Sequence, residues 1–125
     1  MQKNPRDIRN RSLQYSLRAI KLYQALQEAK DGAGWILGKQ YLRAATSIGA
    51  NIEEAQAGES RGDFIHKYGI AQKETRESLY WLRLMALSEI VAFERLRSLM
   101  DETEELYAVI TAIIRSAKNG SKVKG

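Results

Sequence analysis

The sequence predicts an all-α protein that folds as one antiparallel, up-down four-helix bundle. Its 125 residues are rich in Ala, Leu, Glu, Lys, Arg and Gln, which favour helix, and contain a single proline. Four long segments carry apolar residues at intervals of three and four, and short links separate them. No strand-like alternation competes, so the four segments are expected to pack as helices around one core.

The first helix is expected over residues 7–29, before the helix stop at Gly32. Its apolar residues fall on two nearly opposite faces at about 100° per residue. A surface helix of a monomer shows one apolar stripe, so two faces predict contact with both the core and a second surface. One face holds Leu13, Leu17 and Ile20; the other holds Ile8, Tyr15, Ala19, Leu22 and Leu26.

The second helix is expected over residues 35–57, ending at Gly58, and the third over 60–88, where Ser60 and Asp63 form a capping pair. The fourth is expected over 92–117, where apolar residues from Leu96 to Ala117 follow a three-four repeat. The bundle domain would then cover residues 1–117, followed by a basic, disordered tail over 118–125.

The net charge of +5 is concentrated near the two ends of the chain. Basic ends can hold a nucleic acid by phosphate contacts, or can simply keep a protein in solution, and both interpretations stay open. In an antiparallel bundle the first helix begins where the fourth one finishes, so the two basic segments are expected to converge. The expected nucleic-acid-binding residues are Arg6, Arg9, Arg11, Arg18, Lys118, Lys122 and Lys124.

Several kinds of site are not expected. The chain has no cysteine and one histidine, His66, so it lacks the ligands of a zinc site, and no metal, cofactor or catalytic residue is predicted. No apolar run is long enough to span a bilayer, and no signal peptide is recognisable. A cytoplasmic protein that is not an enzyme is the expectation.

A polar stripe runs along the second helix and faces two carboxylates on the third. Folding the hairpin at Glu59 brings Arg43 level with Glu74 and Glu77, so a contact with one of them is expected. The set could be a ligand site or a polar network that specifies helix packing, and packing is favoured because nothing in it titrates near neutrality. If the pair is buried, Arg43→Ala should cost about 3–5 kcal/mol. The network residues are Arg43, Ser47, Asn51, Glu54, Glu74 and Glu77.

Surplus apolar surface on the first and third helices predicts a homo-oligomer. A monomer would expose more of it to water than soluble chains usually do. The expected interface residues are Tyr15, Leu22, Leu26, Ile70, Trp81 and Leu84.

Residues 41–84 resemble the signature of the bacterial 23S rRNA intervening-sequence, or S23-like, four-helix bundle proteins. The stretch YLRAATSIGANIEEAQAGESRGDFIHKYGIAQKETRESLYWLRL contains the family's RAA-x-SI-x-x-N-x-x-E run and then its A-x-x-E-x-x-x-x-L run. These are Arg43-Ala44-Ala45, Ser47-Ile48, Asn51 and Glu54, followed by Ala71, Glu74 and Leu79. One departure is Asn51-Ile52-Glu53-Glu54-Ala55, where the family has Asn-Ile-Ala-Glu-Gly.

The resemblance implies a ring-shaped homopentamer without known catalysis. The basic end IIRSAKNGSKVKG is also similar in character to a related branch, the accessory variability protein of diversity-generating retroelements, which serves nucleic acid and a reverse transcriptase. The leading hypothesis is therefore a non-enzymatic oligomer that binds RNA or DNA, possible partners including a reverse transcriptase. The alternatives are a protein-partner adaptor without nucleic-acid binding and a hydrolase that uses Arg43, Glu74 and Glu77 in an open pocket.

Overall fold

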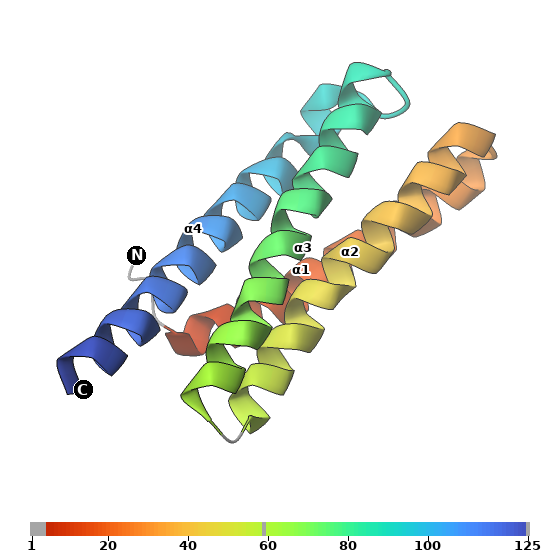
Figure 1. Cartoon of the computed structure of the whole chain (residues 1–125). Helices are drawn as coiled ribbons and strands as arrows, with labels where there is room; N and C mark the ends of the chain where they lie inside the picture. The colour runs from red at the N-terminus through yellow and green to blue at the C-terminus, as the bar shows by residue number, and fades with distance from the viewer. Residues whose placement is uncertain (1–4, 59, 125) are drawn as a thin grey trace.

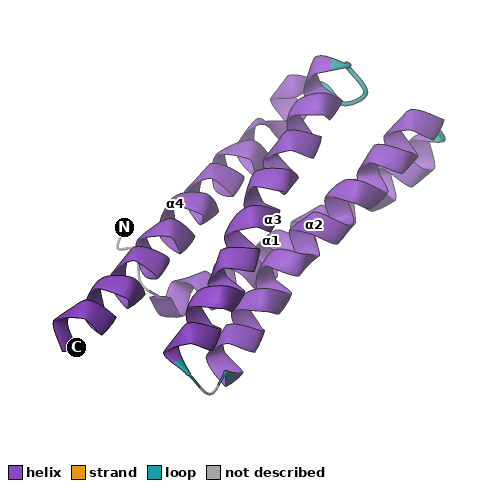
Figure 2. Cartoon of the chain, viewed as in Figure 1, coloured by secondary structure: helices purple, strands orange, loops and turns teal. Residues whose placement is uncertain are grey.

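The chain forms four helices: α1 (Pro5–Ala29), α2 (Gly32–Ala57), α3 (Arg61–Leu87) and α4 (Phe93–Lys124) (Figures 1 and 2). The computed structural model describes residues 5–58 and 60–124, with the side chains of 8–58 and 60–120. Within these ranges no residue is in a strand, so the expected all-α bundle is confirmed. No helix in the described ranges is both long enough and apolar enough to cross a membrane.

Consecutive helices run antiparallel and lie side by side, and α1 also meets α4 (Figure 1). Cross-helix contacts give the register. Arg9 of α1 reaches Glu53 of α2, and Gln72 of α3 reaches Thr111 of α4. Tyr15 of α1 reaches Thr103 of α4, which closes the bundle.

Capping side chains define where two of the helices begin. The Asp31 carboxylate accepts hydrogen bonds from the backbone N–H groups of Ala33 and Gly34, so α2 starts at Gly32 rather than near residue 35. The Ser60 hydroxyl accepts one from the Asp63 N–H, as the capping pair predicted. Lys30 and Glu89 adopt left-handed backbone angles, with φ of 57° and 63°, in the links that follow α1 and α3.

The fourth helix does not end near residue 117; it continues to Lys124 through the segment expected to be a disordered tail. Gly120 alone weakens a helix interior by only about 1 kcal/mol, and no proline follows to stop it. Lysines near a helix C-terminus also interact favourably with its dipole.

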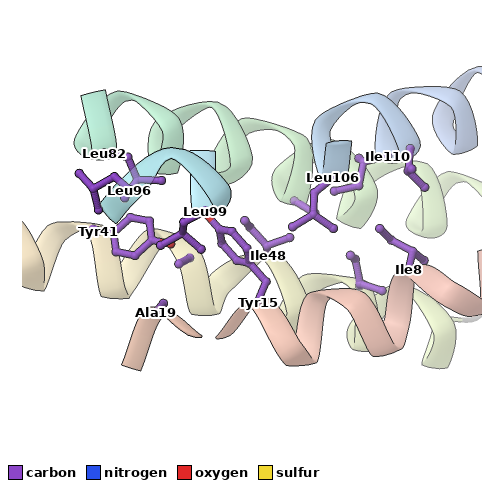
Figure 3. Packing of buried hydrophobic residues seen from close by; sticks show 14 of the residues in the cluster. Ile8, Tyr15, Ala19, Tyr41, Ile48, Leu82, Leu96, Leu99, Leu106 and Ile110 are labelled. Atoms are coloured by element: carbon purple, nitrogen blue, oxygen red, sulfur yellow. The ribbon is translucent and has the colours of Figure 1, made fainter. Parts of the chain in front are cut away.

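The core draws on all four helices (Figure 3). The three-four repeat of α4 points inward as predicted, with Leu96, Leu99, Thr103, Leu106 and Ile110 all buried. Further buried side chains in Figure 3 are Ile8, Tyr15, Ala19, Tyr41, Ile48 and Leu82.

The two apolar faces of α1 have distinct environments, and this corrects part of the expected interface. Tyr15 and Leu26 are 1% and 4% exposed and lie in the core of the chain, so they cannot form a surface between subunits. Leu22 is half-buried against that core. The opposite face remains in solvent, with Leu13, Leu17 and Ile20 exposed at 57%, 47% and 38%. On α3, Ile70, Trp81 and Leu84 are half-buried.

Candidate nucleic-acid interface

Side chains of α2 and α4 engage three arginines of α1, namely Arg9, Arg11 and Arg18. Arg9 makes a two-pronged contact with Glu53, from Nε to Oε2 at 3.1 Å and from Nη2 to Oε1 at 2.8 Å. Both side chains are exposed, and the hydrogen bond from Arg9 lowers the pKa of the Glu53 carboxyl below its ordinary value. The charge of Arg9 is thus largely balanced within the chain.

Arg11 makes the same kind of fork with Glu102 of α4, at 3.1 and 2.8 Å, and its Nη2 lies 3.9 Å from Glu105. Arg18 donates to the Ser98 hydroxyl of α4 at 3.0 Å. These contacts join α1 to α4. The two arginines therefore stabilise the packing of these helices, a role that the sequence pattern alone does not indicate.

Of the remaining expected cations, only Lys118 on α4 has a described side chain. Because Arg11 lies level with Glu102 and Glu105, the exposed Lys118 is roughly 20 Å further along α4, at 1.5 Å per residue (Figure 1). Since α4 runs past the first turn of α1, Lys118 lies beyond Arg11, and the convergence of the two basic segments stays a prediction. The side chains of Arg6, Lys122 and Lys124 lie outside the described residues.

The polar stripe on α2 meets α3 as predicted. Arg43 contacts the carboxylate of Glu77, and its Nη1 lies 3.6 Å from Oε1 of Glu74, which confirms the expected contact. The Arg43 side chain is 53% exposed and that of Glu74 only 10%, so a half-exposed cation covers a nearly buried carboxylate.

The other members of the stripe are separate from this contact. Asn51 donates to the backbone oxygen and the hydroxyl of Ser47, at 2.8 and 3.0 Å, within α2 itself. Glu54 is exposed and takes part in neither contact. Five of the six residues therefore form a cross-helix ion cluster and a local amide–hydroxyl pair, and Glu54 is separate from both.

The ion cluster continues to an aromatic pair on the surface of α3. Trp81 points its Nε1 toward Glu77 Oε1 at 3.4 Å, and its ring meets that of Tyr80 edge to face, with centroids 5.2 Å apart and planes at 69°. Arg43, Glu77, Trp81 and Tyr80 thus form a chain of contacts from α2 to the outer side of α3.

The hydrolase alternative requires an open pocket at this cluster. Four surface hollows of the described residues are lined by other side chains, and none of the four includes Arg43, Glu74 or Glu77. Among the described residues, no group of three His, Cys, Asp or Glu side chains is arranged to hold a metal ion. His66 is exposed.

A basic stripe on the outer face of α3 was not anticipated from the sequence. Lys73, Arg76, Tyr80 and Arg83 are all exposed, at spacings of three, four and three, which place them on one side of a helix. No carboxylate of the described part of the chain lies within ion-pair distance of the three cations. The repeat itself was the available signal, but it is visible only once the inward face of α3 is known. We call these four residues the α3 stripe.

The fold and its side-chain clusters define a four-helix bundle protein in which several ion pairs join neighbouring helices, and one face of α3 carries cations without a carboxylate partner among the described residues. The chain belongs to the 23S rRNA-intervening sequence protein family, whose model matches residues 6–112. It is similar to a crystal structure of a protein with unknown function from the S23 ribosomal protein family of Bacteroides thetaiotaomicron VPI-5482. That structure is 37% identical, covers 91% of this chain and 99% of its own, and superposes with a TM-score of 0.84. No curated protein matches the chain.

Proposed function

We propose that the protein is a non-enzymatic nucleic-acid-binding protein whose main phosphate contacts come from the α3 stripe. The observation that carries the proposal is the set of three exposed cations, Lys73, Arg76 and Arg83, that have no carboxylate partner among the described residues. A cation that is already paired with a carboxylate must break that ion pair before it can bind a phosphate. Arg9 and Arg11 of α1 are therefore weaker candidates than the cations of the α3 stripe.

The dimensions of the α3 stripe suit a phosphate backbone. Lys73 and Arg83 are separated by roughly 15 Å along the helix axis, a length over which one strand of B-form DNA carries about four phosphates. Phosphate contacts of this kind give affinity without sequence specificity.

The test is a binding titration across salt concentrations with fluorescently labelled RNA and DNA. Affinity should fall steeply as salt rises, with a log–log slope of about 0.7 to 0.9 for each phosphate neutralised. A triple variant, Lys73→Gln, Arg76→Gln and Arg83→Gln, should bind weakly and reduce the slope by about 2 to 3.

The matched control carries the same change of charge elsewhere: Lys21→Gln, Lys30→Gln and Arg95→Gln, three other exposed positions. It should keep most of the affinity and nearly the original slope. Absence of binding at low salt, or equal losses in the two triple variants, would overturn the proposal.

A second observation favours self-association as part of the function. Leu13, Leu17 and Ile20 form an exposed apolar face on α1, and the family resemblance suggests that copies of the chain assemble into a ring of five. A ring would repeat the α3 stripe, so that one nucleic acid could engage several copies with higher overall affinity. An adaptor role toward another protein is the alternative use of the same apolar face.

A further inference from the structure

One aromatic side chain stands among the cations of the α3 stripe. Tyr80 lies one turn from both Arg76 and Arg83 and is 56% exposed. Its ring belongs to neither the core nor the partly buried layer around it. Packing in the core therefore does not explain its position.

Its neighbour restrains that ring. Trp81 is half-buried, packs against the core and meets Tyr80 edge to face. Glu77, itself held by Arg43, accepts from the Trp81 indole N–H. An aromatic ring that is restrained before binding loses little conformational freedom when a ligand stacks on it.

We infer that the α3 stripe selects single-stranded nucleic acid, with an unpaired base stacked on Tyr80 and flanking phosphates bound by Arg76, Arg83 and Lys73. This inference rests on the proposed function. The faces of bases in a duplex are covered by their stacked neighbours, so only a single strand, loop or end offers a free base to an aromatic ring. An acidic protein segment would satisfy the cations but would not require the aromatic ring between them.

The experiment compares three labelled probes of equal length: a single strand, its duplex, and an abasic deoxyribose-phosphate strand that keeps the phosphates and lacks the bases. The wild-type chain should bind the single strand most tightly. Tyr80→Leu should weaken that binding about fivefold or more, because stacking on one aromatic side chain contributes at least that factor. It should leave binding of the abasic strand, and the salt slope for all probes, unchanged.

Two further variants serve as controls. Tyr80→Phe keeps a stacking ring and should stay within about twofold of wild type. Phe93→Leu removes another aromatic side chain, 50% exposed at the start of α4, and should have no effect. Far-ultraviolet circular dichroism of each variant verifies that the helices are retained.

The outcomes of this experiment distinguish a failure of this inference from a failure of the proposed function on which it rests. If no probe binds, both fail. If binding depends on Lys73, Arg76 and Arg83 but the duplex binds as tightly as the single strand, or Tyr80→Leu is neutral, only the selection of single strands is refuted. Poly-glutamate that binds as tightly as the single strand and is indifferent to Tyr80→Leu would refute it in favour of an acidic protein partner.

Discussion

The Nη1 atom of Arg43 on α2 lies 3.6 Å from Oε1 of Glu74 on α3, a carboxylate oxygen that is buried and has no hydrogen-bond partner among the described residues. The arginine is half-exposed while the glutamate is nearly buried. Water therefore screens the cation but reaches the carboxylate poorly. The contact is intermediate between a surface ion pair and a buried one.

Arg43→Ala should accordingly destabilise the fold by about 1–2 kcal/mol, less than the 3–5 kcal/mol expected for a fully buried pair. The loss arises mainly because the nearly buried Glu74 carboxyl group loses its neighbouring cation. Urea unfolding followed by circular dichroism measures it. Arg76→Ala on α3 removes an unpaired exposed arginine and should change stability by less than about 0.5 kcal/mol. Adding Glu74→Gln should recover part of the loss; a loss of 3 kcal/mol or more would show that the pair behaves as a buried one.

Two glycines inside helices should respond differently to alanine. A Cβ atom at Gly69 of α3 would meet nothing within 4 Å, so Gly69→Ala should stabilise the fold by about 0.5–1 kcal/mol through helix propensity. At Gly38 of α2 the same atom would lie 2.8 Å from Cδ1 of the buried Leu26, which must shift. Gly38→Ala should therefore be less stable than Gly69→Ala in thermal unfolding; the reverse order would contradict the close packing of α1 on α2.

Two buried tyrosines allow a matched comparison. The Tyr15 hydroxyl is hydrogen-bonded to Thr103 at 2.6 Å, whereas the Tyr41 hydroxyl is buried and has no hydrogen-bond partner in the described part of the chain. Tyr15→Phe should cost about 1 kcal/mol, and Tyr41→Phe should be neutral or stabilising, because it removes an unsatisfied polar atom. Equal losses in chemical unfolding would mean that Tyr41 has a partner after all.

The same tyrosines predict a loss of stability at alkaline pH. Burial raises the pKa of Tyr15 and, with a smaller contribution from Tyr15 itself, the pKa of Tyr41. An unfolded tyrosine ionises near pH 10, so above about that pH the unfolded chain releases protons that the folded chain retains, and stability falls. The contribution is complete below pH 10. Tyr41→Phe should make the decline shallower, by an amount that approaches about 1.4 kcal/mol per pH unit only above about pH 11, measured as unfolding free energy between pH 9 and 11.5; an unchanged slope would refute it.

The exposed face of α1 predicts an assembly that one substitution can break. Light scattering at micromolar concentration should give a mass above the 14.2 kDa of one chain, and Leu17→Glu should lower it by placing a charge in an apolar interface. Leu87→Glu, at a side chain 76% exposed on α3, is the control and should keep the mass. A wild-type particle of 14.2 kDa would contradict self-association.

Local patterns predicted much of the candidate network but little of the candidate interface. Arg43 and its glutamates could be placed together because a hairpin of two helices sets the level of each residue from its distance to the turn. The α3 stripe could not be predicted in this way. The spacing of residues shows which of them share a helix face, but it does not show which face is turned toward solvent. The contacts of Arg9, Arg11 and Arg18 could not be predicted either, because their partners Glu53, Glu102 and Ser98 are remote in the chain.

By itself the sequence determined four helices, most of their ends, the inward repeat of α4 and the level at which α2 meets α3. Helix propensity, capping and periodicity act within a few residues, so they can be read without knowing the fold. Only the tertiary structure decided which face of α1 enters the core and that α4 runs past the start of α1. It also decided which cations are balanced by carboxylates, and that Tyr80 is exposed among the cations that have no carboxylate partner. These features depend on how the helices rotate and slide against one another, and that is decided by the packing of side chains from distant parts of the chain.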